Sequence, residues 1–423
     1  MALTPFIRTL LAASLLGTAI GVGLGNPRSQ SPIPPTSDAS TTSDTSILVA
    51  AGGGAPAYNE IALEKNVRYF QRTLSALDIG LSSVSQYFAN GSDGEATVRY
   101  LDWLGRERFK VPEIPALDGA ATVENMEQWF TQRAVAPQDC SSFFYFTGHG
   151  AYNRKDQDNN AMILWHEELV SVQRLAGWLD RLPPDRPFVT MMAQCYSGAF
   201  ANIIYEQGDP SNPVALQSRC GFFATVAERP SVGCTPAVNE ADYRDYSSSF
   251  FAGLSGRDRT GEKVASADYD GSGQVSYTEA HAFAKVDEAT TDWPVSTSEA
   301  WLQRRANRTD RAQIFSRPLQ EWVGLASPQR RYVVEGLVAK LEFDLEQPYA
   351  VQARPEDIET VAGAYWVRLG MELVNIAMIK RIQADGSDAD RAVLNQLLTC
   401  EAGHLAEAVT QPPELAAADR RRL

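Results

Sequence analysis

The sequence of 423 residues has few basic residues for its length. Lysine and arginine total 38, against 52 aspartates and glutamates, so the formal net charge is -14. Nucleic-acid-binding proteins carry basic patches that neutralise phosphates, so this balance argues against a nucleic-acid partner. Hydrophobic residues make up 44% and charged residues 21%, which is typical of a soluble globular protein and excludes a disordered or multispanning chain.

Cysteine is also scarce, and the count of five is odd. In an oxidising environment an odd count leaves at least one thiol free or paired between chains. One free nucleophile and up to two disulfides fit this number. Cys220 and Cys234 flank a short segment, so we expect a bridge between them; the equal alternative is that both are small buried hydrophobic residues.

The N-terminus has an apolar run from Leu10 to Leu24, preceded by Arg8. This pattern predicts that residues 1–25 are an export signal, with an uncleaved membrane anchor as the alternative. Residues 26–45 are rich in proline, serine and threonine and have little to bury, so they predict a disordered linker. The protein is therefore expected to be exported: periplasmic, extracellular or tethered to a membrane by its N-terminal segment.

From residue 46 to about residue 306, apolar β-prone runs alternate with amphipathic helical patterns. SSFFYFTGHG and PFVTMMAQCYSGAF are the clearest buried strands, and each ends in a glycine turn. Alternation of this kind predicts βαβ units, with a largely parallel sheet between two helical layers. Residues 307–423 show helical patterns without strands, which predicts a separate helical C-terminal domain.

Two of these strands end beside residues with catalytic chemistry, and ligands bind at the carboxyl ends of parallel strands. A thiol hydrolase needs a thiolate, a base and N–H donors for the oxyanion. We therefore expect Cys195 to be the nucleophile and His149 the general base. Gly150 exposes a backbone N–H that no side chain shields, a natural oxyanion donor together with the N–H of Cys195. A lone strand cysteine is usually core and a lone histidine structural, but both at strand ends beside glycine turns favour catalysis.

The stretch from Ile47 to about Ser255 resembles the caspase/legumain superfamily of cysteine peptidases. YFTGHG looks like its histidine motif and QCYSG its cysteine motif, and their separation is close to the roughly 50 residues expected. GGGAPAYNEIALEKNVRYFQ and GFFATVAERPSVGC are similar to pocket segments of the legumain branch. The resemblance implies a caspase-like αβα sandwich, endopeptidase activity on protein or peptide substrates and no organic cofactor. It also implies that Asn59 orients His149 as a third triad member; from the residues alone, Asn59 equally fits a turn.

Three positions depart from the family pattern. Ala193 stands where the family has an acidic residue, Ile61 where legumains have a pocket arginine, and Gly148 where legumains have an aspartate. The charges that read asparagine or a basic residue at the cleavage point are therefore missing, which favours a smaller or more apolar pocket. The alternative is that Glu228, Glu240 or Asp242 restores an acidic pocket wall, which would favour a basic residue at the cleavage point.

Residues 268–279, DYDGSGQVSYTE, fit the EF-hand calcium loop position by position. A poor helix precedes this stretch, so we expect a lone loop rather than a paired hand; the alternative is a solvated polar turn. Since three ligands are charged, binding is expected on the order of micromolar to millimolar. The expected ligands are Asp268, Asp270, Ser272, the carbonyl of Gln274, Ser276 and Glu279.

Together, these features predict an exported, calcium-binding cysteine endopeptidase. Its C-terminal helical domain is expected either to inhibit the active site as a prodomain, which the legumain resemblance implies, or to be an interaction module. The missing pocket charges support an alternative from another class, a non-catalytic calcium-dependent binding or scaffold protein on a peptidase fold. An intact set of cysteine, histidine and asparagine argues against that alternative.

Overall fold

The structure is a computed structural model that describes residues 45–136 and 141–405. The predicted signal or anchor (1–25) lies outside the described residues, as do nearly all of the predicted linker (26–45) and Cys140. Within the described ranges, none of the helices combines the length and the apolar character that crossing a bilayer requires.

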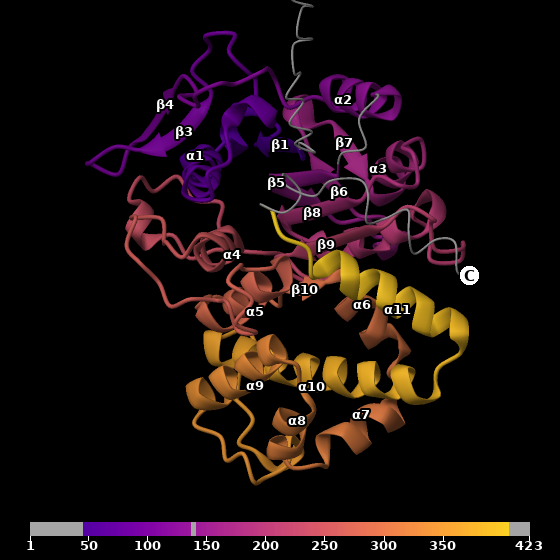
Figure 1. The fold of residues 1–423 in the computed structure, drawn as a ribbon. Coiled ribbons are helices and arrows are strands. Elements are labelled where there is room, and N and C mark those ends of the chain that lie inside the picture. The colour runs from indigo at the N-terminus through magenta and orange to yellow at the C-terminus, as the bar shows by residue number, and fades with distance from the viewer. Residues whose placement is uncertain (1–44, 137–140, 406–423) are drawn as a thin grey trace, which may run out of the picture. The chain divides into compact units, whose positions relative to one another are not determined.

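A mostly parallel sheet organises the chain, and Figure 1 shows most of its strands in purple and magenta. Its strands are β1 (Ser46–Gly52), β2 (Val84–Phe88), β5 (Ser142–Ala151), β6 (Ala161–Ile163), β7 (Leu169–Ser171), β8 (Phe188–Ala193), β9 (Arg219–Phe223) and β10 (Val295–Ser296). The order is β10-β9-β8-β5-β1-β2, with β6 and β7 continuing from β5. The pairs from β9 to β2 are parallel, whereas β10, β6 and β7 pair antiparallel. A separate hairpin pairs β3 (Val98–Leu101) with β4 (Glu107–Lys110).

Helices cover both faces of the sheet. They are α1 (Ile61–Ala76), α4 (Tyr246–Ser255) and α5 (Tyr277–Asp287) on one face, and α2 (Val123–Val135) and α3 (Val172–Leu179) on the other. Successive strand side chains point to opposite faces. Ile47 and Val49 therefore pack with the first layer, and Leu48 and Ala50 with the second. The predicted α/β architecture with a largely parallel sheet between helical layers is confirmed.

Short 3-10 helices connect many of these elements. They are η1 (Pro56–Tyr58), η2 (Leu81–Ser83), η3 (Gln157–Asn159), η4 (Trp165–Glu167), η5 (Ser197–Ile204), η6 (Glu206–Gly208), η7 (Glu240–Asp242) and η8 (Tyr349–Val351). The first and the fifth follow β1 and β8, so they lie at the carboxyl edge of the sheet where the predicted site residues are found.

The C-terminal part of the chain is helical, as predicted. Its helices are α6 (Thr297–Arg305), α7 (Arg308–Phe315), α8 (Leu319–Leu325), α9 (Pro328–Leu341), α10 (Val361–Asp385) and α11 (Asp388–Glu401). The described residues, 45–136 and 141–405, belong to one compact unit, and the boundary predicted after residue 306 falls within it. A buried charge network crosses that position: Lys285 of α5 pairs with Glu299 of α6 and with Glu372 of α10 (2.6 Å). Buried charges need partners, and these partners come from both sides of the predicted boundary.

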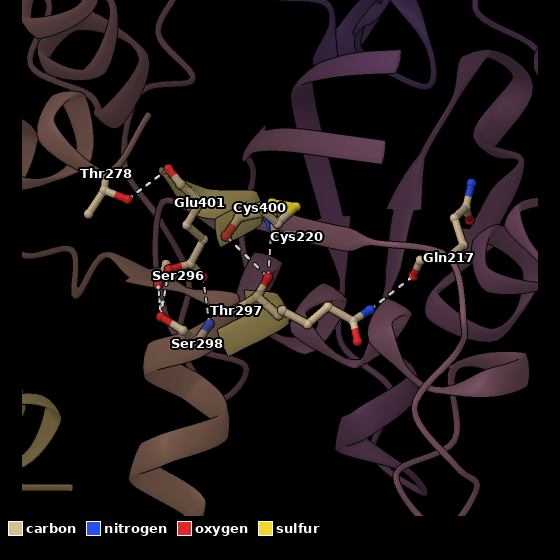
Figure 2. The surroundings of a disulfide bond; sticks show 10 residues. Gln217, Cys220, Thr278, Ser296, Thr297, Ser298, Cys400 and Glu401 are labelled. Carbon is tan, nitrogen blue, oxygen red and sulfur yellow. Dashed lines mark hydrogen bonds between the residues drawn. A yellow bond between two sulfur atoms is a disulfide. The ribbon is translucent and has the colours of Figure 1, made fainter. Parts of the chain in front are cut away.

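A disulfide also joins the two parts (Figure 2). It links Cys220 of β9 to Cys400 of α11, with the Cα atoms 6.0 Å apart. The expected bridge between Cys220 and Cys234 is therefore wrong, and Cys234 is a free, exposed thiol. Cys220 lies near the start of β9, beside the edge strand β10, and packs in the core on the α1, α4 and α5 side together with Cys400 at the end of α11. Cys234 lies in the segment that follows the carboxyl end of β9.

Candidate active site

The strand register places His149 and Cys195 side by side at the carboxyl edge of the sheet. β5 and β8 pair in parallel, with Thr147 opposite Ala193. His149, still within β5, and Cys195, in the turn after β8, each follow two residues later, and neighbouring strands lie only about 4.8 Å apart. The two predicted catalytic residues are therefore brought together.

Gly150 fits between them. A Cβ atom at this position would lie 1.9 Å from the carbonyl oxygen of Cys195. No real side-chain carbon tolerates that distance, so only glycine lets the histidine strand approach the cysteine turn this closely. The turn continues at Tyr196, which has a left-handed backbone (φ 62°) and donates its N–H to the carbonyl of Arg229 (2.8 Å).

The thiol of Cys195 is partly buried beneath the chain that follows β9. Its Sγ accepts a hydrogen bond from the backbone N–H of Ser231 (3.3 Å). Burial raises the pKa of Cys195, and the N–H of Ser231 offsets part of that effect. In the free protein this residue therefore favours the neutral thiol.

His149 is held by the residues just before α1. Its Nε2 lies 2.8 Å from the carbonyl oxygen of Tyr58 and 3.0 Å from Oε2 of Glu60. Both partners only accept hydrogen bonds, so Nε2 carries a proton. Glu60 is fixed in turn by Arg99, which donates to its Oε1 (2.6 Å). Burial alone would lower the pKa of His149, but Cys234 and Glu60 outweigh it and raise this pKa to about 11.

Asn59 lies between Tyr58 and Glu60 in sequence, but its side chain forms its hydrogen bonds with residues other than His149. The side chain is fully buried; it accepts from the N–H of Gly53 (3.1 Å) and donates to Thr97 (3.3 Å). It thus secures the turn after β1. The orienting role expected for Asn59 falls to Tyr58 and Glu60, because the side chain of Asn59 points into the core.

A segment without regular structure, residues 229–238, covers the two catalytic candidates. Ser231 contacts Cys195, as described, and Cys234 lies near His149, with its Sγ 3.9 Å from the carbonyl oxygen of Gly148. Buried Asp292 anchors the segment by accepting from the hydroxyl of Ser231 (2.7 Å) and the N–H of Val232 (3.1 Å). Burial raises the pKa of Asp292 to about 7.

Few of these contacts are indicated by the sequence. The position of Glu60 beside the motif residue Asn59 is one available signal, whereas the spacing of the cysteines predicts a disulfide for Cys234. Ile61, expected at a pocket position, is instead buried in the core as the first residue of α1. Ala193 is partly buried and packs on the same core.

The predicted calcium loop, residues 268–279 (the acidic loop), is a compact turn leading into α5. Carboxylate oxygens of Asp268, Asp270 and Glu279 lie within 4.8 Å of one another. The hydroxyl of Ser272 donates to the carbonyl of Gln274 (3.0 Å) and lies 3.4 Å from the Asp268 carboxylate. The Ser272 and Gln274 oxygens are therefore close to the three carboxylates.

The last two predicted ligands of the acidic loop also cap a helix. Ser276 accepts from the N–H of Glu279 (3.3 Å), and the Glu279 carboxylate accepts in return from the N–H of Ser276 (2.9 Å), which completes a capping box for α5. Residues 256–267 contain no helix, in agreement with the expected lone loop. The oxygen-only donor set fits a hard cation such as calcium.

Chemically, the edge of the sheet offers a thiol, a protonated imidazole that a carboxylate orients, and a backbone turn packed tightly against both. No family model matches the chain, and no curated protein matches it either. What the site does is therefore argued from its own residues.

Proposed function

We propose that the protein is a cysteine endopeptidase of the caspase/legumain type, acting on protein or peptide substrates. The observation that carries this proposal is the pairing of β5 with β8, whose last pair joins Thr147 to Ala193, two residues before His149 and Cys195. Gly150 packs against the Cys195 carbonyl, so the two turns form one surface. That edge is the place where parallel α/β sheets bind ligands.

The reaction begins when the thiol of Cys195 releases its proton to water, because a neighbouring imidazolium stabilises the thiolate that remains. The sulfur bonds to the carbonyl carbon of the peptide, and the N–H groups of Gly150 and Cys195 hold the oxyanion. As the C–N bond breaks, His149 gives its proton to the leaving amine. The neutral imidazole then takes a proton from water, whose oxygen attacks the thioester and releases the acid. Glu60 keeps the ring in place throughout.

Segment 229–238 must move aside for a substrate, because it contacts both catalytic candidates in the free protein. The C-terminal helices brace this segment. Arg229 pairs with Glu359, just before α10 (2.8 Å), and fully buried Arg368 of α10 donates to the carbonyl of Asp292 (2.8 Å). This bracing supports a C-terminal region that restrains the active site.

The test uses the full chain and a denatured proteome as substrate, with sequencing of the new termini. Cys195→Ser should lower turnover at least about 1,000-fold, as the loss of a nucleophile does elsewhere. Cys234→Ser is the matched control, since it removes the second free thiol near His149, and it should keep turnover. Iodoacetamide should label Cys195 in a manner that depends on His149. Unchanged turnover in Cys195→Ser would overturn the proposal.

The competing function is a non-catalytic, calcium-dependent scaffold. Two observations favour it. Segment 229–238 covers the catalytic candidates, and the acidic loop is well formed. It predicts no new termini from any substrate and equal alkylation of Cys195 with and without His149. For the acidic loop itself, we propose weak calcium binding through the oxygens described above.

A further inference from the structure

A second group of residues at the carboxyl edge of the sheet has the composition of a metal site. Glu60, His149 and Cys234, here called the Glu–His–Cys cluster, place a carboxylate oxygen, an imidazole nitrogen and Sγ within 4.8 Å of one another. They come from three distant segments: the turn before α1, the end of β5 and segment 229–238. Cys234 is exposed and forms no disulfide, so its sulfur is available as a ligand.

The spacing of the donor atoms suits a small tetrahedral cation. Zinc bonds of about 2.0–2.3 Å to nitrogen, oxygen and sulfur place neighbouring ligand atoms about 3.4–3.6 Å apart. In the protein, Nε2 of His149 lies 3.0 Å from Oε2 of Glu60. Shifts of a few tenths of an ångström would therefore form the site, and exposed Cys234 has room to make them.

The orientation of the His149 ring also favours a metal site at the Glu–His–Cys cluster. The proton on Nε2 of His149 points at two oxygens together, the Tyr58 carbonyl and Glu60 Oε2. A cation that replaced this proton would meet both oxygens and the nearby sulfur. The other carboxylate oxygen of Glu60 is occupied by Arg99 (2.6 Å), an arrangement that orients a ligand from outside the site.

We propose that the Glu–His–Cys cluster binds one thiophilic divalent cation, of which Zn²⁺ is the best fit, and that this binding switches the active site off. A mixed set of imidazole, thiolate and carboxylate favours zinc over calcium or magnesium, which prefer oxygen alone. Three protein ligands leave one coordination position open. The inhibitory part rests on the proposed peptidase function, because metal on Nε2 would deny His149 its proton-transfer role; the binding part stands alone.

The binding experiment uses the full-length protein, stripped of metal and titrated with Zn²⁺ against a chromogenic chelator. One equivalent should bind, and Cys234→Ser and Glu60→Gln should each weaken binding, the former more than about 100-fold. Co²⁺ provides a second readout: its thiolate charge-transfer band should appear in the wild type and be absent in Cys234→Ser. Circular dichroism checks that each variant is folded.

The control variant is Cys195→Ser, which should keep both the Zn²⁺ affinity and the Co²⁺ band. This result separates the two proposals, because the same variant abolishes turnover. Zinc binding without any peptidase activity would overturn only the proposed enzyme and the inhibition. The metal site itself is overturned if Zn²⁺ fails to bind, or if Cys234→Ser binds as tightly as the wild type.

Discussion

The Glu–His–Cys cluster and the acidic loop each gather three ligand groups within 4.8 Å, but they are built in different ways. The acidic loop takes all of its oxygens from residues 268–279, so its shape is local. The cluster takes one residue from each of three segments, and only the sheet brings them together. The acidic loop is therefore visible in the sequence, whereas the Glu–His–Cys cluster appears only in the fold.

The two sites also differ in chemistry. The acidic loop has oxygen donors alone, most of them already bonded to its own backbone, as when Asp268 accepts from the N–H of Gly273 (3.0 Å). The cluster mixes nitrogen, sulfur and oxygen around one proton. We expect the loop to affect mainly stability and the cluster to affect mainly reactivity, and three further measurements test this contrast.

The largest effect should come from breaking the disulfide with Cys220→Ala and Cys400→Ala. The bridge spans 180 residues of sequence, and its loss should lower the free energy of unfolding by about 2–5 kcal/mol. The end of α11 holds the start of α5: Glu401 accepts from the hydroxyl of Thr278 (2.7 Å), and Gly403 accepts from the N–H of Tyr277 (2.9 Å).

Hydrogen exchange shows which site depends on this bridge. In the double variant, the amide of Tyr277, beside the acidic loop, should exchange faster. The amide of Ser231, beside the cluster, should keep its native rate under conditions where the protein stays folded. Equal acceleration at both positions would contradict the contrast.

A middle-sized effect is expected from Glu279→Gln in the acidic loop. The buried carboxylate accepts from the N–H groups of Tyr269 (2.8 Å), Asp270 (3.2 Å) and Ser276 (2.9 Å). An amide turns one acceptor into a donor, so the free energy of unfolding should fall by about 1–3 kcal/mol, measured by urea denaturation.

The exposed Glu262 offers the matched control, because Glu262→Gln makes the same chemical change without burial. That control should leave stability unchanged. Calcium should raise the melting temperature of the wild type and of Glu262→Gln, but not of Glu279→Gln. Zinc affinity should be the same in all three proteins; a loss of zinc binding in Glu279→Gln would show that the two sites are coupled.

The smallest effect, measured per pH unit, comes from Asp292 and should act on the cluster side alone. Asp292 anchors segment 229–238, and burial raises its pKa to about 7. Between pH 4 and 7 the folded protein therefore keeps a proton that the unfolded chain has lost, and stability falls as pH rises through this window. In Asp292→Asn this fall should be shallower, by at most about 1.4 kcal/mol per pH unit. Chemical denaturation at several pH values measures the slope, and identical slopes would refute the assignment.

Much of the fold was predictable because its signals are local. Apolar runs marked β5 and β8, and Thr122 has the side chain of a typical helix cap: it accepts from the N–H of Asn125 (3.3 Å) at the start of α2. His149 and Cys195 followed from the rule for strand ends. Long-range partners could not be predicted in this way: no local pattern indicates that Glu60 will face His149.

The cysteines show the same limit. Proximity in sequence favours Cys234 as the partner of Cys220, but Cys220 lies near the start of β9 and Cys234 in the segment beyond the end of that strand. Cys400 is distant in the chain and adjacent in the core, because α11 returns to the sheet. Pairing of this kind depends on topology, which composition and spacing do not specify.

The bridge between β9 and α11 also determines what proteolytic maturation could release. A cut in residues 352–360, ahead of α10, would leave both fragments joined through sulfur, with the Lys285–Glu372 pair still holding them together. Cleavage in an oxidising compartment would thus give a two-chain protein rather than a shortened one. Shedding the C-terminal piece would take a reductant as well as a protease, and gels run with and without thiol would tell the two products apart.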